Sequence, residues 1–461
     1  MNYQEYLARK ASVDPATGLA NVETLHPALF GYQSDIVKWA LRRGRAAIFA
    51  GTGLGKTLME IVWATEVAKA TGKPVLILTP LAVAAQFVAE GARFGLPVTR
   101  AASRDDVSTG VYVTNYDKLP RFDLEAFGGI VLDESSILKS YTGATRNALI
   151  EGCRAIPFRL AATATPAPND FMELGNHAEF LGVMTYVEML AMFFVHDGSD
   201  TQKWRLKGHA QSEFWQWMCS WAVMLTKPSD LGYDDALHNL PPLLTNQHTV
   251  AVEYKPSLET GLLFPVEART MQERIGARRD TIAERVACAA SIINGNDRPW
   301  VAWCNLNAET DALIKAIPGA VGVNGADSEE LKEARLEAFA RGDIRVIVTK
   351  PSVCGFGMNW QHCCDTAFVG LNDSFEQVFQ AVRRFWRFGQ TNPVNVHFIA
   401  AETEGAVVAN LARKEADASR MIAAMVANMA DITSVEIKGQ ARDKAGYAPT
   451  QTQLPSFWKV A

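Results

Sequence analysis

A glycine-rich turn between an apolar run and an amphipathic segment constrains the fold of this chain more than any other feature. The turn reads Ala-Gly-Thr-Gly-Leu-Gly-Lys-Thr over residues 50–57 and follows a short apolar run at 46–49. Residues 58–70 then carry apolar side chains at helical spacing, so the turn joins a buried strand to a helix. Glycines let the backbone N–H groups converge at the helix N-terminus, where the helix dipole favours a phosphate. The pattern therefore predicts a site for the phosphates of a nucleotide.

Two side chains at the end of this turn have predicted roles in nucleotide binding. Lys56 would neutralise the β- and γ-phosphates of ATP, and the Thr57 hydroxyl would ligate Mg²⁺. Upstream, the side-chain amide of Gln33 offers the donor and the acceptor that an adenine edge requires. The residues that we expect around the phosphates are Gly51, Thr52, Gly53, Leu54, Gly55, Lys56 and Thr57.

Apolar runs alternate with helical segments through the first part of the chain. The sequence predicts strands at 75–80, 111–116, 129–132 and 158–162. This alternation indicates a parallel sheet with both faces covered by helices. Ligands of such sheets bind at the carboxyl ends of the strands, so polar residues that follow these runs are candidate site residues.

Two carboxylates follow the predicted strand at 129–132. Asp133 would hold Mg²⁺, and Glu134 would polarise the water that attacks the γ-phosphate. An acidic pair alone is usually part of an ordinary surface loop. Because this pair follows a strand of the same sheet as the phosphate turn, we favour the catalytic interpretation.

Length and composition set the remaining bounds. A chain of 461 residues predicts two or three domains, and its net charge of −5 gives no global sign of nucleic-acid binding. The seven cysteines form no Cys-x-x-Cys pair, which predicts reduced thiols and a cytoplasmic location. We find neither a signal peptide nor an apolar run long enough to cross a bilayer, so no membrane association is expected.

The order of the motifs resembles that of the superfamily-two helicase-like ATPases. The closest resemblance is to Snf-type, chromatin-remodeller-like DNA translocases, in the minimal form found in phages and bacteria. In the second half, residues 354–360 resemble the glycine-rich motif five of these proteins, and residues 380–390 match motif six, ending in Arg-x-Gly-Gln. The matching segments of the first half are Gln33, 50–57 with alanine at its start, 79–81, 114–116, 133–134 and 163–166.

The resemblance implies an α/β fold of two tandem RecA-like parallel-sheet lobes with a helical insertion between them. We expect an ATP-binding first lobe at 1–180 and a second lobe carrying arginine fingers at 266–430. Residues 181–265 would form the helical insertion and connector, and residues 431–461 a C-terminal tail that offers a contact for a protein partner.

The second lobe should complete the nucleotide site. Arg384 and Arg387 are three residues apart, which on a helix places both on one face and lets them reach the γ-phosphoryl transition state together. A solvated basic patch is the plainer interpretation of these arginines in isolation. Gly357 and Asn359 in the motif-five segment would lie near a phosphate, because glycines there permit close backbone approach.

A nucleic-acid strand should cross both lobes on the side opposite the ATP cleft. Backbone and hydroxyl contacts at these positions would bind the phosphodiester backbone without reading bases, which is how an acidic chain can hold DNA. The residues that we expect to face the strand are Thr79, Pro80, Thr114, Asn115, Asn324, Gly325 and Thr349.

Three functions remain open on the sequence. The first is an ATP-dependent translocase on double-stranded DNA, the second a strand-separating DNA or RNA helicase, and the third a nucleotide-dependent DNA clamp or loader component. An aromatic stripe in the insertion allows stacking on bases but is better explained as a core stripe. Its members are Phe214, Trp217, Met218 and Trp221.

Overall fold

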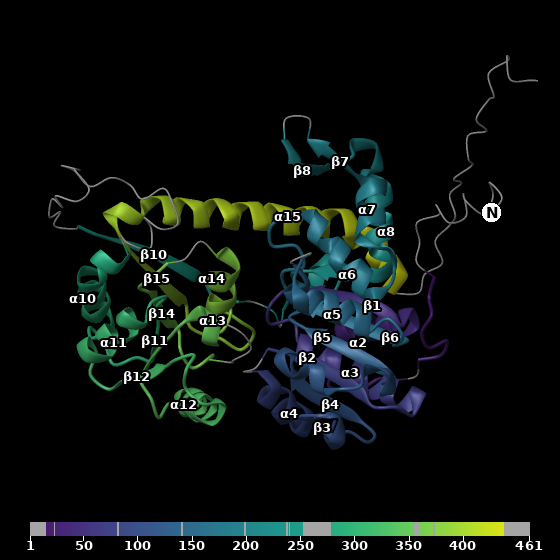
Figure 1. Ribbon diagram of the computed structural model, residues 1–461, viewed down its shortest axis with the longest axis horizontal. Helices are drawn as coiled ribbons and strands as arrows, with labels where there is room; N and C mark the ends of the chain where they lie inside the picture. Colours follow the sequence, from purple (N-terminus) through teal and green to yellow (C-terminus); the bar gives the residue numbers. More distant parts are fainter. Residues whose placement is uncertain are drawn as a thin grey trace, which may run out of the picture.

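The computed structural model shows two α/β lobes that lie side by side, with one long helix running across both (Figure 1). Each lobe is built on one parallel sheet, which confirms the predicted class of two tandem RecA-like lobes. The structure describes residues 15–22, 24–80, 83–139, 142–197, 200–236, 238, 240–251, 278–354, 360–371 and 374–437.

The first lobe contains a seven-stranded sheet whose strands all run parallel. In spatial order the strands are β3 (Val98–Arg100), β4 (Val111–Asn115), β2 (Val75–Thr79), β5 (Gly129–Asp133), β6 (Phe158–Thr163), β1 (Arg45–Ala50) and β9 (Ala222–Leu225). The helices of this lobe are α2 (Gly31–Arg43), α3 (Lys56–Thr71), α4 (Ala84–Arg93), α5 (Ala144–Gly152), α6 (Leu174–Leu181), α7 (Tyr186–Phe193) and α8 (Gln211–Trp221).

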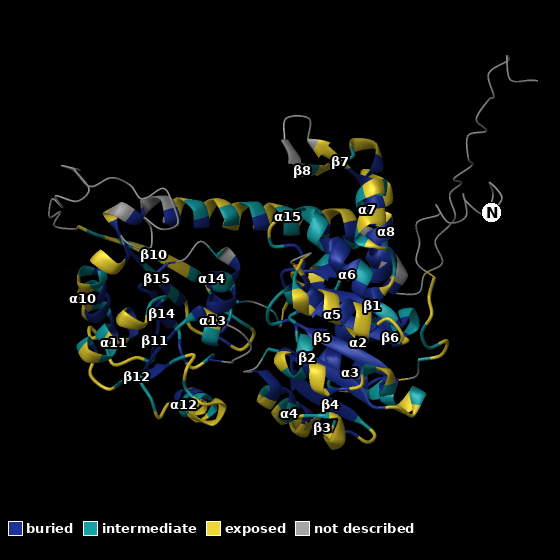
Figure 2. Cartoon of the chain, in the orientation of Figure 1, coloured by how far each residue is buried: buried dark blue, intermediate teal, exposed yellow. Residues whose placement is uncertain are grey.

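The apolar runs form buried strands because both faces of the sheet are covered. Along β1, Ile48 packs into one core cluster and Phe49 into the cluster on the opposite face. Successive strand residues point to opposite faces, so a run without polar residues fits only a sheet with two apolar sides. Figure 2 shows the strands as the buried centre of each lobe, with exposed residues on the outer helices.

The second lobe repeats this plan with six parallel strands. In spatial order they are β10 (Leu243–Val250), β15 (Val394–Ala401), β14 (Asp365–Phe368), β11 (Trp300–Trp303), β13 (Val346–Thr349) and β12 (Ala320–Val323). The helices are α10 (Ile282–Ile293), α11 (Asn307–Ala316), α12 (Glu329–Arg341), the single turn α13 (Pro351–Cys354), α14 (Phe375–Val382) and α15 (Gly405–Ile437).

The segment between the lobes takes part in both sheets. Strand β9 pairs with β1 and completes the first sheet, and β10 pairs along its whole length with β15 of the second. Between α7 and α8, strands β7 (Phe194–Asp197) and β8 (Asp200–Leu206) form an antiparallel hairpin. The aromatic stripe of α8 is confirmed as core, since none of its four side chains is more than 1% exposed.

Helix α15 connects the two lobes a second time. It starts in the second lobe, crosses above both lobes in Figure 1, and packs its last turns against α8 and β9 of the first lobe. Met425 and Met429 belong to the first-lobe core, and the Cys219 thiol donates to the Met429 carbonyl at 3.8 Å. The helix continues to Ile437, past the position where we expected the tail to begin, and Thr433 and Ile437 are buried.

Three sequence expectations concern residues outside the described ranges. Gly357 and Asn359 of the motif-five segment lie there, and so do residues 438–461 of the tail with its expected partner contact. Among the helices that the structure describes, none combines the length and the apolar character needed to cross a bilayer.

Candidate functional site

The phosphate turn links β1 to α3 at the carboxyl edge of the first sheet. Gly53 and Gly55 have positive φ angles of 84° and 74°, which side chains other than glycine rarely adopt. The Gly51 N–H donates to the Leu225 carbonyl at 2.9 Å and so attaches the turn to β9. Within the described chain, the N–H groups of Gly53 and Gly55 have no protein acceptor, so both are available to an anion.

Lys56, the first residue of α3, lies inside this turn. Its ammonium group donates to the carbonyl of Ala50 at 2.8 Å and to that of Gly51 at 3.4 Å. Burial lowers the pKa of Lys56, and the nearby carboxylates of Glu134 and Asp133 oppose that shift. A phosphate at the turn would give the ammonium a stronger acceptor than these two carbonyls.

Asp133 ends β5 next to this lysine. The Thr79 hydroxyl donates to the Asp133 carboxylate at 3.2 Å, and the Tyr116 hydroxyl donates to the Asp133 carbonyl at 2.7 Å. Burial raises the pKa of Asp133 to about 7, and the negative charge of Glu134 adds to that shift. The positive charges of Lys56 and Arg384 oppose this shift, but burial has the larger effect.

Glu134 has an unusual backbone conformation. Its φ of 53° makes it the one residue other than glycine with positive φ among the described residues. The Thr163 hydroxyl, at the end of β6, donates to its carboxylate at 3.4 Å. Positive φ is uncommon outside glycine and is found at active sites, where the surrounding structure holds the strained residue in place.

The predicted magnesium ligands fit that ion. Mg²⁺ prefers oxygen ligands and usually takes one or two from the protein, with the rest from phosphate and water. Thr57 and Asp133 provide a hydroxyl and a carboxylate at the phosphate turn, and the Asp133 Oδ1 atom accepts no hydrogen bond from described residues. No group of three His, Cys, Asp or Glu side chains in the described part of the chain could hold a metal without a nucleotide.

Glu60 is a site residue that the sequence analysis missed. It lies one helical turn after Lys56 on α3, is fully buried, and neither carboxylate oxygen has a hydrogen-bond partner among the described residues. Burial raises the pKa of Glu60 well above its usual value, and Asp133 raises it further. An acidic residue inside the apolar run Leu58–Val62 was the available signal.

The two arginines lie in a turn after α14 and not on a helix, so that expectation was wrong. Helix α14 ends at Val382, and the chain then turns through hydrogen bonds such as Arg384 N–H to the Ala381 carbonyl at 3.2 Å. Gly389, with φ of 91°, ends this turn. This tight turn directs both arginine side chains toward the first lobe, although the two residues do not lie on one helix.

Each arginine faces the carboxylates across the lobe boundary. Arg384 is 4% exposed, and its guanidinium donates to the Gln380 backbone carbonyl at 3.0 Å and side-chain oxygen at 3.2 Å. Burial lowers the pKa of Arg384 to about 10, while Glu134 and Asp133 oppose that shift. Burial also lowers the pKa of Arg387, with Glu90 and Glu134 opposing it, and its Nε atom has no partner within the described ranges.

The lobes also touch at the phosphate turn. A Cβ atom built on Gly53 would lie 2.7 Å from the backbone nitrogen of Phe388, which follows Arg387. Only glycine fits at position 53, where the phosphate turn approaches the backbone of Phe388. The charges of Asp133, Glu134 and Arg387 act on the pKa values of both Lys56 and Arg384, so these five residues lie near one another where the lobes meet, a place that we call the crevice.

An aromatic pocket of about 180 Å³ adjoins the phosphate turn. The rings of His238 and Phe388, from opposite sides of the lobe boundary, are parallel within 9° with centroids 6.3 Å apart. Phe30, Tyr32 and Tyr233 complete the aromatic wall. Flat, apolar walls of this kind suit the base of a nucleotide.

Gln33 lies between this pocket and the phosphate turn. Its amide nitrogen donates to the Leu54 carbonyl at 2.9 Å, and its amide oxygen accepts from the Phe30 N–H at 2.9 Å. A Cβ atom on Gly55 would lie 2.2 Å from the same amide nitrogen. In this structure Gln33 therefore holds the shape of the turn, and its proposed contact with adenine stays a prediction.

The residues expected to face a nucleic-acid strand are not gathered on one open surface. Thr79, Thr114, Asn115 and Thr349 are at most 4% exposed, and the Thr349 hydroxyl donates to the Val323 carbonyl. Pro80 and Asn324 are half-buried, and Gly325 is exposed. An ion pair at 3.8 Å between Lys118 and Glu329 joins the lobes near this side. Their contact with nucleic acid stays a prediction.

The fold and the crevice define the class of the protein. It is a two-lobed α/β protein with a candidate nucleotide site between its lobes. No protein-family model matches the sequence. The chain is similar to the DNA annealing helicase and endonuclease ZRANB3 of Mus musculus, with 21% identity over 438 residues, covering 82% of this chain. This similarity confirms the predicted resemblance to Snf-type helicase-like ATPases.

The extent of these similarities limits what they establish. The chain spans 39% of the length of the mouse protein. Among solved structures, it is similar to the Sulfolobus solfataricus SWI2/SNF2 ATPase core in complex with dsDNA. That match has 18% identity and a TM-score of 0.42, and it covers 91% of this chain and 98% of the other.

Proposed function

We propose that this protein is an ATP-dependent nucleic-acid motor, and specifically a translocase on double-stranded DNA that hydrolyses ATP between its lobes. The observation that carries the proposal is that Glu134 acts on the pKa of both arginines across the lobe boundary, and Asp133 on that of Arg384. Neither lobe contains a complete site, so hydrolysis requires the lobes to close, and phosphate release lets them part.

Each residue of the crevice has a proposed role. The N–H groups of the phosphate turn and Lys56 hold the triphosphate, and Glu134 orients the attacking water. Arg384 and Arg387 stabilise the charge that develops on the γ-phosphoryl group. Thr57 and Asp133 would hold Mg²⁺, which when bound neutralises the β- and γ-oxygens.

DNA is the proposed polymer. The mouse relative is named a DNA annealing helicase, and residues 387–390 have the Arg-x-Gly-Gln ending of the Snf-type motif. The endonuclease activity in that name is not carried over, because the match covers only part of the mouse protein.

The experiment that tests this function measures phosphate release with no polymer, with single-stranded DNA, with double-stranded DNA and with RNA. We expect strong stimulation by double-stranded DNA and displacement of the third strand from a triplex, without wide separation of a duplex. Efficient RNA unwinding would instead support a strand-separating helicase. ATP-dependent DNA binding with no turnover on any polymer would support a clamp or loader component.

A further inference from the structure

An ion pair between Lys139 and Glu376 joins the two lobes beside the candidate site. Lys139 is the last residue of η5 (Ser135–Lys139), the 3₁₀ turn that begins directly after Glu134. Glu376 lies in the first turn of α14, and its side chain is 9% exposed. The pair therefore connects the segment after the acidic pair to the helix before the arginines.

The first-lobe end of this pair is held by buried contacts. The Lys139 carbonyl accepts from the Asn176 amide on α6 at 3.2 Å. Asn176 is 1% exposed, and its amide oxygen accepts from Arg146 at 3.2 Å. These contacts fix the backbone of Lys139 within the first lobe.

The second-lobe end leads directly to an arginine. Glu376 lies one helical turn before Gln380, which binds the Arg384 guanidinium through both its backbone and its side-chain oxygen. Arg384 in turn faces Glu134. The ion pair and the Gln380 contacts thus connect the segment that follows Glu134 to the guanidinium of Arg384.

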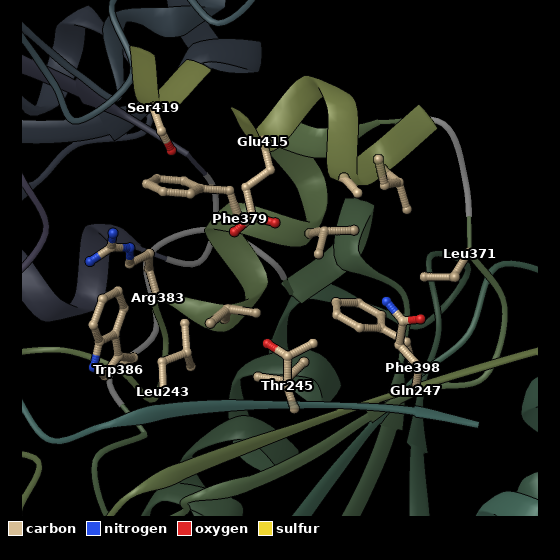
Figure 3. Close-up of a pocket in the computed structure, with 15 residues that line it drawn as sticks. Leu243, Thr245, Gln247, Leu371, Phe379, Arg383, Trp386, Phe398, Glu415 and Ser419 are labelled. Atoms are coloured by element: carbon tan, nitrogen blue, oxygen red, sulfur yellow. The ribbon is translucent and has the colours of Figure 1, made fainter. Parts of the chain in front are cut away.

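The packing of α14 within its own lobe leaves room for movement. A cavity of about 330 Å³ separates one side of α14 from the sheet and from α15 (Figure 3). Phe379, Arg383 and Trp386 line it from α14 and the turn that follows, opposite Thr245 of β10 and Glu415 of α15. A helix with a void on one flank is fixed less firmly by dispersion contacts than a fully packed helix.

We propose that Lys139 and Glu376 are positioning residues, which hold α14 so that Arg384 reaches the transition state only when the lobes have closed. This inference rests on the proposed function, because it assigns a role in ATP hydrolysis. An exposed pair would contribute little, but the Glu376 carboxylate is nearly buried and loses its compensating charge if Lys139 is removed.

The first test measures DNA-stimulated ATP turnover in Lys139→Ala, in Glu376→Gln and in the reversed pair Lys139→Glu with Glu376→Lys. We expect each single change to lower kcat about tenfold, while the KM for ATP changes less than about twofold. A tenfold loss corresponds to an interaction energy typical of two residues in contact. The reversed pair should regain most of the lost kcat. Failure of the reversed pair to exceed the single variants would overturn the proposal.

A matched control uses another ion pair between the lobes. Arg100 and Glu333 lie 2.9 Å apart, with side chains 38% and 34% exposed, on β3 and α12. Arg100→Ala should leave turnover without DNA unchanged, because neither residue adjoins the acidic pair or the arginines. A tenfold loss in this control would mean that any contact between the lobes has the same effect, which contradicts a specific positioning role.

The second test does not depend on turnover. A carbodiimide joins a lysine amine to a carboxylate only when the two groups touch, and the linked peptides are identified by mass spectrometry. We expect a Lys139–Glu376 link whose yield rises with a non-hydrolysable ATP analogue. A yield that the analogue leaves unchanged would overturn the dependence of this contact on lobe closure, even if the protein proved to have no ATPase activity.

Discussion

Glu134 of the first lobe lies close enough to Arg384 of the second lobe that its negative charge opposes the lowering of the arginine pKa by burial. The two residues come from different lobes, Arg384 from the turn after α14 and Glu134 from the end of β5. The candidate site is therefore assembled only when the lobes come together.

Glu134→Gln should keep ATP binding and lose turnover. The amide fills the same space but cannot accept the proton of the attacking water, so we expect a loss of roughly 10²-fold or more. ATP affinity, measured with a fluorescent analogue, and phosphate release distinguish the two effects. Turnover at the wild-type rate would show that another group activates the water.

Arg387→Ala should lower kcat by roughly 10³-fold or more while the affinity for ATP falls far less, as expected for a group that acts on the transition state. Arg387→Lys should not restore the rate, because an ammonium lacks the planar fork of donors. Arg341→Ala is the control, since that arginine is 60% exposed and pairs with Glu337 and Asp343 of its own lobe. Equal losses in both alanine variants would contradict the assignment.

Glu134→Gly should be more stable than Glu134→Gln. Glycine adopts the observed φ of 53° without strain, whereas glutamine keeps that strain, so we expect a gain of about 1 kcal/mol in the free energy of unfolding. Urea unfolding of both variants without nucleotide measures the difference. Equal stabilities would mean that the backbone at this position is not strained.

The stability of the nucleotide-free protein should fall as pH rises from about 4 to about 7. The folded protein keeps a proton on Asp133, whose pKa is raised from 3.8 to about 7, at pH values where the unfolded chain has released it. One such proton changes the free energy of unfolding by at most about 1.4 kcal/mol per pH unit. Urea unfolding at several pH values measures the slope.

Two variants separate the carboxyls that contribute to this slope. Asp133→Asn should reduce the dependence of the free energy of unfolding on pH. Glu60→Gln should reduce it further, since burial raises the pKa of Glu60 as well. A slope that is unchanged in both variants would mean that other groups hold the protons.

Phe388→Ala should raise the KM for ATP by roughly tenfold with a smaller effect on kcat, because one face of the base would lose its aromatic neighbour. Phe388→Tyr should bind ATP like the wild type. Nucleotide affinity measured by calorimetry checks both variants, and an unchanged affinity in the alanine variant would place the base elsewhere.

Much of the fold followed from the sequence because the strands that carry the site are continuous apolar runs. Strands β1, β2, β4, β5 and β6 lie where the pattern predicted them. The apolar pattern indicates no strand at β14 or β15, because β14 has four residues, two of them polar, and the first half of β15 alternates apolar and polar residues. Short or mixed strands resemble loops until their neighbours are known.

The sequence predicts the charged residues of the candidate site, but not the turns and hydrogen-bond partners that position them. The phosphate turn and the acidic pair have local signatures, so Lys56 and Glu134 could be named directly. The turn that carries Arg384 could not be predicted, because it is fixed by Gly389 and by contacts with residues distant in the sequence. The partners of Gln33 and Lys139 likewise depend on tertiary packing.

Helix α15 has a consequence for dividing the protein into parts. Because Met425 and Met429 complete the core of the first lobe, a fragment that stops after β9 would leave the apolar flank of α8 bare. Two halves produced as separate polypeptides should therefore reassociate when the second half retains residues 405–437, and the first half alone should precipitate. A helix that begins in the second lobe therefore supplies part of the core of the first lobe.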